Sequence, residues 1–259
     1  MKLALSMGIN SRRENLEGMG GFDIANVPDL LTWFKFNTNI STADKDSDGD
    51  DDITWTSSHT DARTARQTTD AEEPNLVAGY VHFDGSNDNL DLSSDLTLGE
   101  FTMFLAIDFD GLSNETVLGK TDDSQMFMRF GFQNLANKFR FRRGNAATNN
   151  VDGIMSEDLT IGSVNLITIT SKLTAGTSDS TLQIERSTKS GSTITTNQVY
   201  EVTDTTFSHT DNLVIDTIGV QTAASAPADM KLYEFVVFSA KVPDAIRANI
   251  QQDILNRIG

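Results

Sequence analysis

The stretch Phe101–Phe109 reads Phe-Thr-Met-Phe-Leu-Ala-Ile-Asp-Phe, and it carries the clearest structural signal in the chain. Large apolar residues occupy its first, third, fifth, seventh and ninth positions. Because successive side chains of a β-strand point to opposite faces, this alternation predicts a strand with one face in the core.

Similar short runs lie on both sides of this stretch. Residues 126–132 and 138–142 are separated by a polar turn at 133–137, which predicts an antiparallel hairpin whose basic residues face away from its phenylalanines. Many short strands without intervening helices are typical of a sandwich or barrel. Further strands are predicted at 30–36, 53–55, 80–83, 164–171, 181–186, 198–202, 213–220 and 232–238, with a tight turn at 84–89 leading into Leu90 and Leu92.

One helix is predicted, at the carboxyl end of the sequence. Pro243 suits a first helical position, and Gly259 suits the residue that follows a helix. Between them, isoleucines recur every fourth residue, which places them in one stripe along a helix. We expect that stripe to pack on a sheet, and its members are Ile246, Ile250, Ile254 and Ile258.

The composition excludes several classes of function. The 259 residues include 37 acidic and 20 basic side chains, which gives a formal charge of −17. Such a chain repels nucleic acid and anionic lipid, so neither is an expected partner. The absence of cysteine removes disulfides, thiolate ligands and cysteine nucleophiles. No apolar run is long enough for a membrane span, and the chain can form one main core.

The first 28 residues form a separate region in this interpretation. They contain Gly8, Gly18, Gly20 and Gly21 and no sustained period of 2 or 3.6, so they cannot bury a face on their own. The apolar start breaks at Gly8 and does not read as a targeting segment. We therefore expect an amino-terminal arm over residues 1–28 and one domain over residues 29–259.

Two segments together resemble a known family. Residues 81–90 read Val-His-Phe-Asp-Gly-Ser-Asn-Asp-Asn-Leu, and residues 232–238 form an apolar strand followed by the predicted helix. This pair is similar to the turn and the closing strand of concanavalin A-like, laminin-G-type jelly rolls, a group often found in bacteria and bacteriophage particles. The resemblance implies an all-β, antiparallel two-sheet jelly-roll sandwich with a short carboxyl-terminal helix. This scaffold serves lectins, glycan-cleaving enzymes and structural modules alike, so it does not decide the function.

An acidic loop is the one candidate metal site in the sequence. Alternate carboxylates around Gly49 offer hard oxygens to Ca²⁺, although Trp55 stands where a calcium-binding EF-hand loop has its bidentate glutamate. The alternative is a solvated acidic turn that adds to solubility. Calcium is thus the one cofactor that the sequence suggests, and its candidate ligands are Asp44, Asp46, Asp48, Asp50 and Asp52.

No catalytic constellation is visible, so we expect a protein that is not an enzyme. The acidic residues Glu72, Glu73, Glu185 and Glu201 do not form a paired array, and the three histidines are dispersed without a GxSxG motif. Glu234 interrupts an apolar strand, which predicts a structural hydrogen-bonding role.

The basic strip Lys138, Arg140, Arg142 and Arg143 is the local exception to the acidic balance. It is interpreted as a solvent-facing side or a guarded sheet edge. An acidic neighbour or a sugar acid is its alternative partner.

Two functions remain open at this level. The first is a bacteriophage virion structural protein, a capsid decoration or tail-fibre module located in the virion. It would attach through its arm to other virion proteins and to copies of itself. The second is a carbohydrate-binding adhesion module, in which exposed aromatic rings near polar loops hold a glycan. The candidate rings are Trp55, Tyr80 and Tyr200.

Overall fold

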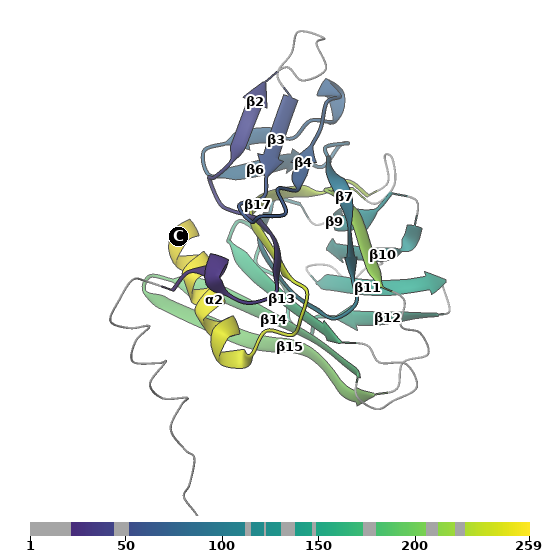
Figure 1. Cartoon of the computed structure of the whole chain (residues 1–259), viewed down its shortest axis with the longest axis vertical. Coiled ribbons are helices and arrows are strands. Elements are labelled where there is room, and N and C mark those ends of the chain that lie inside the picture. The colour runs from purple at the N-terminus through teal and green to yellow at the C-terminus, as the bar shows by residue number, and fades with distance from the viewer. Residues whose placement is uncertain are drawn as a thin grey trace, which may run out of the picture.

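The protein is a β-sandwich with a helix on one outer face (Figure 1). The computed structural model describes residues 22–43, 52–111, 115–121, 123–130, 138–146, 149–172, 180–205, 212–220 and 226–259. Its elements are η1 (Ile24–Asn26), β1 (Leu30–Phe34), β2 (Ile40–Ala43), β3 (Asp52–Thr56), β4 (Thr64–Arg66), η2 (Asp70–Glu72), β5 (Asn75–Val77), β6 (Tyr80–Asp84), β7 (Leu90–Leu98), β8 (Phe101–Phe109), β9 (Glu115–Lys120), β10 (Asp123–Phe130), β11 (Phe139–Ala146), β12 (Asn149–Ile154), β13 (Asn165–Lys172), β14 (Ser180–Ser190), β15 (Thr193–Thr205), β16 (Leu213–Ile218), β17 (Asp229–Phe238) and α2 (Asp244–Ile258). Among these residues, no helix combines the length and apolarity that crossing a membrane requires.

The described strands form two antiparallel sheets. The first has the order β15-β14-β13-β8-β17-β6-β5, and the second has the order β12-β11-β10-β9-β16-β7-β4-β3-β2. Strand β17 is the centre of the first sheet, because β8 pairs with it along one side. On its other side, β6 pairs with its first half and β1 with its second half. Strands from both ends of the described chain therefore meet in the middle of one sheet.

The main core lies between the sheets, and β8 shows how the sequence encodes it. The five alternating apolar residues of β8 all belong to this core, as predicted. Its other face is buried as well. Phe104 and Ala106 pack there beneath a layer that α2 and η1 form, which we call the helix layer. Burial of both faces explains why β8 is apolar almost throughout.

A second core lies between the outer face of the first sheet and the helix layer. Ile250 and Ile254 of α2 are fully buried there, which confirms that the isoleucine stripe packs on a sheet. Ile24 of η1 joins the same core with no exposed surface. Residues 22–28, which the predicted arm includes, therefore contribute to the packing of this second core. Residues 1–21 lie outside the described residues.

Most predicted strands are present. The hairpin of β10 and β11 pairs Phe130 with Phe139, and Phe139 and Phe141 belong to the main core. Its turn, residues 133–137, lies outside the described residues. The sequence did not predict β2, β4, β5, β9 and β12.

The turn after β6 holds a buried carboxylate. Asp88 is 4% exposed, and its Oδ2 accepts a hydrogen bond from the Asp84 backbone N–H at 2.8 Å. Burial raises the pKa of Asp88 from its ordinary 3.8 to about 6, and the backbone hydrogen bond opposes that rise. The folded protein therefore favours the neutral acid at this position.

This raised pKa predicts a pH-dependent loss of stability. The favourable contribution of protonated Asp88 is complete below pH 4 and is lost as the pH rises through about 6. Asp88→Asn keeps a neutral acceptor and removes this dependence. The stability of the wild type relative to Asp88→Asn is expected to fall by about 2–3 kcal/mol between pH 4 and pH 7.5. Urea unfolding of both proteins at each pH measures this difference. If the stabilities of the two proteins changed with pH in parallel, the raised pKa of Asp88 would be contradicted.

Candidate functional site

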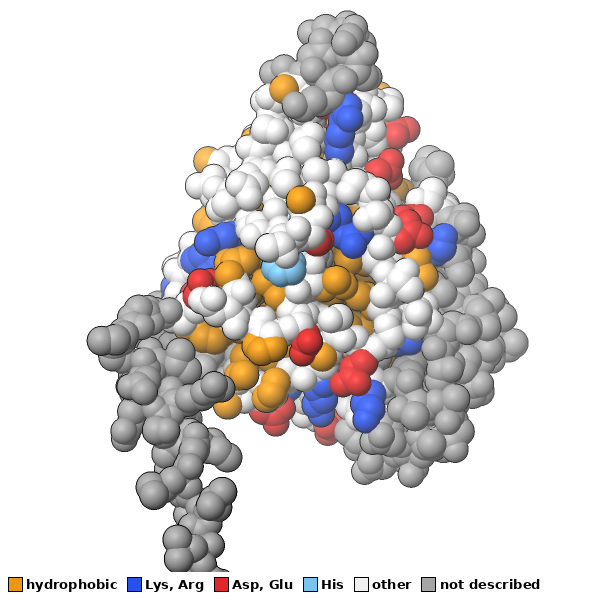
Figure 2. Space-filling view, in the orientation of Figure 1, with side chains coloured by type: hydrophobic (Ala, Val, Ile, Leu, Met, Phe, Trp, Pro, Cys, Tyr) orange, Lys and Arg blue, Asp and Glu red, His pale blue; other side chains and the backbone are white. Residues whose placement is uncertain are grey.

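Charged side chains do not mark a site on the face of the molecule that Figure 2 shows. Figure 2 shows acidic and basic side chains scattered over one face, with hydrophobic side chains interspersed among them. Local geometry therefore has to identify a binding site, and two grooves are candidates.

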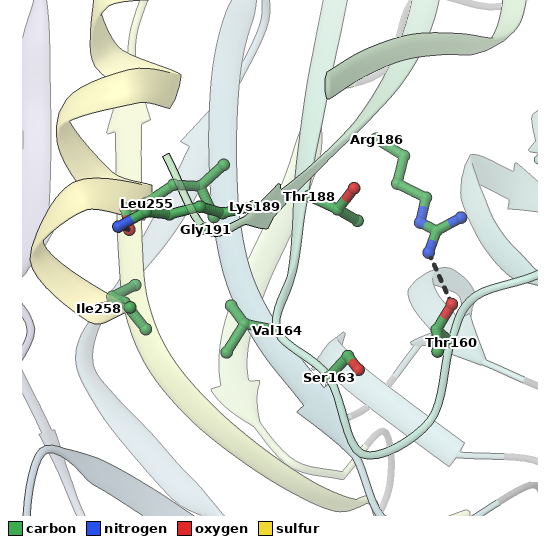
Figure 3. A pocket seen from close by; sticks show the side chains of 10 residues that line it. Thr160, Ser163, Val164, Arg186, Thr188, Lys189, Gly191, Leu255 and Ile258 are labelled. Carbon is green, nitrogen blue, oxygen red and sulfur yellow. Dashed lines mark hydrogen bonds between the residues drawn. The ribbon is translucent and has the colours of Figure 1, made fainter. Parts of the chain in front are cut away.

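The first groove, of about 430 Å³, lies between the end of α2 and the β14–β15 hairpin (Figure 3). Its cations already hold its walls together. Arg186 donates to Asn165 Oδ1 and to Thr160 Oγ1, both at 2.9 Å, and Lys189 Nζ donates to the Leu255 carbonyl at 3.4 Å. We therefore interpret it as a seam between the helix and the hairpin.

The second groove, of about 310 Å³, lies between the β1–β2 turn and the β5–β6 turn. Its volume falls at the lower end of the roughly 300–1,000 Å³ that is usual for ligand pockets. Asn37 and Asn39 have φ of 48° and 56°, a left-handed conformation that asparagine tolerates in tight turns. We call it the aromatic groove after the rings that lie beside it. Its lining residues, none of which is aromatic, are Asn37, Asn39, Ile40, Leu76, Val77, Ala78 and Gly79.

A cluster of three half-buried aromatic rings lies beside this groove. The Tyr80 ring is 5.1 Å from the Tyr233 ring, and the Phe36 ring is 6.1 Å from it, measured between centroids. Gly79 allows this approach, because its φ is 93° and an added Cβ would lie 2.7 Å from the Phe36 ring. Burial raises the pKa of Tyr233, which keeps its hydroxyl protonated.

The aromatic groove combines apolar surface with amide groups. Leu76 is 42% exposed and Val77 is 37% exposed, and they are the exposed large hydrophobic residues of the described chain. Asn37 and Asn39 are also exposed, and each side-chain amide offers both donors and acceptors. A small ligand with apolar faces and a hydroxylated edge fits this combination.

The three aromatic residues predicted to bind glycans do not come together. Tyr80 flanks the aromatic groove as described above. Trp55 has no exposed surface, so the expectation of an exposed ring is wrong for this residue. Its ring packs 5.6 Å from Phe34, and its Nε1 donates to the Thr38 carbonyl at 3.2 Å. Trp55 thus supports the turn that lines the groove. Tyr200 lies in β15, where its hydroxyl donates to the Asp152 carbonyl at 3.0 Å.

The predicted calcium loop is described only at its end. Asp44, Asp46, Asp48 and Asp50 lie outside the described residues. Asp52 begins β3, is 3% exposed and lies 3.3 Å from Arg66 Nη2. An ion pair within the sheet therefore accounts for this one carboxylate of the five.

The basic strip surrounds a carboxylate. Arg140 Nε and Arg142 Nη2 donate to Asp152 at 2.6 and 2.7 Å. Burial lowers the pKa of Arg129 to about 10, and the charges of Arg142 and Arg140 act in the same direction. Arg143 is 1% exposed and donates to the Gly99 carbonyl at 2.9 Å. The expectation that the strip faces solvent is therefore wrong for Arg140 and Arg143, because the fold buries both.

Two of the isolated glutamates, Glu185 and Glu234, hold the helix layer to the sandwich. Glu234 is fully buried and accepts from Trp33 Nε1 and Arg257 Nη2, both at 2.6 Å, which confirms its predicted structural role. Glu185 accepts from Arg247 Nη2 at 2.8 Å and from Gln251 Nε2 at 2.8 Å. Both carboxylates therefore fasten α2 to the sandwich.

Comparisons with known proteins extend this description. The sequence matches no protein-family model and no characterised protein sequence. The structure resembles a sialidase from Trypanosoma rangeli in complex with sialic acid, with a TM-score of 0.55 and 10% identity over 91% of this chain and 35% of that chain. It also resembles the ligand binding domain of botulinum neurotoxin serotype D in complex with N-acetylneuraminic acid. The TM-score is 0.54 and the identity 10%, over 87% of this chain and 50% of that chain.

A third structure matches over almost its whole length. It is domain 4 of AbnA, a GH43 extracellular arabinanase from Geobacillus stearothermophilus, in complex with arabinotriose. The TM-score is 0.51 and the identity 11%, over 89% of this chain and 98% of that domain. The chain shares their β-sandwich fold. By contrast, it spans only about a third of the sialidase and half of the neurotoxin chain.

Proposed function

We propose that this protein is a carbohydrate-binding module that holds a neutral glycan in the aromatic groove. The observation that carries the proposal is the placement of the Phe36, Tyr80 and Tyr233 rings beside an exposed apolar edge and two exposed asparagine amides. A sugar ring presents C–H groups on its faces and hydroxyl groups around its edge. Aromatic and aliphatic side chains suit those faces, and amides suit the hydroxyl groups.

The charge of the groove favours a neutral sugar over an acidic one. None of its described lining residues is lysine or arginine. The whole chain carries a formal charge of −17, which repels an anionic ligand at low salt. A neutral oligosaccharide needs no cationic partner in the groove and is not repelled by the negative charge of the chain.

The groove also favours binding without cleavage. Glycosidic bond hydrolysis commonly uses two carboxylates about 5–9.5 Å apart across the bond. The described lining residues include no aspartate, glutamate or histidine. We therefore propose that the protein is not a glycosidase and uses the groove for attachment.

The structural neighbours support carbohydrate binding. The neurotoxin ligand binding domain, of which this chain covers 50%, was solved with N-acetylneuraminic acid, and the arabinanase domain, of which it covers 98%, was solved with arabinotriose. The first of these sugars is acidic, so the preference for a neutral glycan rests on the charge of the groove. A role as a virion structural protein would instead use the amino-terminal arm, most of which lies outside the described residues. No described contact favours that role over glycan binding.

Tyr80→Ala is expected to weaken glycan binding. The variant removes one ring of the cluster, and loss of about 1–1.5 kcal/mol of aromatic contact corresponds to roughly a 10-fold rise in Kd. A glycan array containing arabino-oligosaccharides, other neutral glycans and sialylated glycans would first select a ligand for the wild type. Calorimetric titration of that glycan would then compare the variants.

Tyr200→Ala is the matched control for this measurement. It removes a half-buried tyrosine of β15, which is not among the groove residues, so Kd is expected to stay within about 2-fold of the wild-type value. Equal affinities of wild type and Tyr80→Ala would exclude the aromatic groove as the site. A wild-type protein that binds no glycan on the array would contradict the function itself.

A further inference from the structure

A second group of side chains lies on the outer face of the first sheet and shares strand β6 with Tyr80. His82 comes from β6, Asp110 follows β8, and Asp229 begins β17. The His82 ring nitrogen and one carboxylate oxygen of each aspartate all lie within 4.8 Å of one another. The sequence did not suggest this group, because its members are far apart along the chain.

The sheet ladder fixes these three residues. His82 stands opposite Lys231 in the pairing of β6 with β17, and Asp229 stands opposite Asp84. The Asp110 backbone N–H donates to the Asp229 carbonyl at 3.0 Å. Rigid backbone pairing on three strands is the support that a preorganised site requires.

The distance between two of the groups already suits a metal ion. His82 Nε2 lies 3.4 Å from Asp110 Oδ2. Two ligands that bind one tetrahedral ion with bonds of about 2.1 Å are also about 3.4 Å apart. Lys231 Nζ donates at 2.6 Å to the other oxygen of Asp110, Oδ1, so it orients this carboxylate and leaves Oδ2 toward His82.

A third carboxylate lies beside the group. Asp108 Oδ2 lies 3.5 Å from Lys231 Nζ, so Lys231 serves Asp108 and Asp110 together. Asp108 is 6% exposed, so Lys231 also neutralises a buried carboxylate here. Three carboxylates, those of Asp108, Asp110 and Asp229, therefore lie around His82 and one lysine, and a bound dication would balance their charge.

The backbone closes the site from one side. A Cβ on Gly111 would lie 2.5 Å from Glu115 Oε1 and 3.2 Å from Asp229 Oδ2. Glu115 Oε2 accepts from the Asp229 backbone N–H at 3.3 Å. The side chains of His82 and Asp110 are 31% and 30% exposed, so water can reach the group.

We propose that His82, Asp110 and Asp229 bind a transition-metal dication of the Zn²⁺ class, with water completing its coordination. One imidazole and two carboxylates are ligands that Zn²⁺ uses, and a three-ligand protein site leaves a fourth position open. The imidazole disfavours Ca²⁺ and Mg²⁺, which prefer oxygen ligands alone. This site does not depend on glycan binding.

Zinc titration of the purified full chain tests the proposal. A chromophoric chelator competes for Zn²⁺ in the presence of millimolar Ca²⁺, which saturates oxygen-only sites such as the predicted acidic loop. The wild type is expected to bind one Zn²⁺ at this site, and its Tm is expected to rise with Zn²⁺ concentration. His82→Gln and Asp229→Asn are each expected to weaken binding at least about 10-fold.

His59→Gln is the matched control. His59 Nδ1 lies 3.9 Å from Asp61, and its side chain is 24% exposed, so it offers a comparable imidazole and carboxylate elsewhere. Its removal is expected to leave Zn²⁺ affinity unchanged. Melting curves without metal show whether each variant is folded, and Asp110→Asn replaces any variant that is not. The proposal is overturned if the wild type binds no Zn²⁺, if Ca²⁺ displaces it, or if His82→Gln and His59→Gln bind it equally.

Discussion

Arg257→Met is expected to destabilise the folded protein by about 3–5 kcal/mol at pH 7.5, because it leaves a buried charge without its cation. Glu234 has no exposed surface, and Arg257 Nη2 donates to its Oε1 at 2.6 Å. Trp33 Nε1 donates to the same oxygen but carries no charge. Urea unfolding of the variant and the wild type measures the loss.

The loss is expected to shrink as the pH falls. Burial raises the pKa of Glu234, and the charge and hydrogen bonds of Arg257 oppose that rise. Without Arg257, the pKa of Glu234 rises further, so its carboxyl group is neutral over a wider pH range. Because a raised carboxyl pKa gives stability that is lost as pH rises, the deficit should be smaller at pH 5 than at pH 7.5.

Lys35→Met is the matched control for this prediction. Lys35 Nζ lies 4.7 Å from the Trp33 ring centroid, so it is a cation on the same tryptophan. A cation over an aromatic ring at a partly exposed position contributes about 0.5–1 kcal/mol. A deficit for Arg257→Met of that small size, or one that is equal at both pH values, would show that the charge of Glu234 does not depend on Arg257.

Trp55→Ala is expected to cost about 3–5 kcal/mol of folding stability, because it empties a large volume of the main core. Trp55 has no exposed surface, and its ring contacts Phe34 at a centroid distance of 5.6 Å. Thermal and urea unfolding measure the cost. The expected result separates this residue from Tyr80, whose replacement lowers glycan affinity with a smaller effect on stability.

Trp55→Phe provides the graded comparison. It keeps an aromatic ring in the core but removes the Nε1 donor to the Thr38 carbonyl. A cost of about 1–2 kcal/mol is expected from imperfect packing and the lost hydrogen bond. If the alanine and phenylalanine variants were equally stable, the ring would not contribute to the core in the way the structure indicates.

Much of the fold could be predicted from the sequence, because burial leaves a pattern. Strand β8 and helix α2 were predicted close to their observed bounds, since each buries apolar residues at its own period. The strand β5 has three exposed residues and no alternation, so no such signal marks it. Its position at the sheet edge depends on pairing with β6, which local sequence does not encode.

The candidate site was predicted only in part, for a similar reason. Tyr80 was identified because it stands at the start of a strand near polar turns. Phe36 and Tyr233 were not, because their contact depends on how β1 and β6 share the two halves of β17. Trp55 was assigned to the surface because a tryptophan among polar residues gives no sign of which way it points. Side-chain direction at such positions is decided by tertiary packing.

The central position of β17 constrains how the protein is made. All the strands that flank β17 precede it in the sequence, and the described pairing of β1 is with β17 alone. During folding, β1 therefore cannot join the sheet before β17 does. Contacts between such distant segments slow folding. We therefore expect completion of the first sheet to be a late step in the folding of this protein.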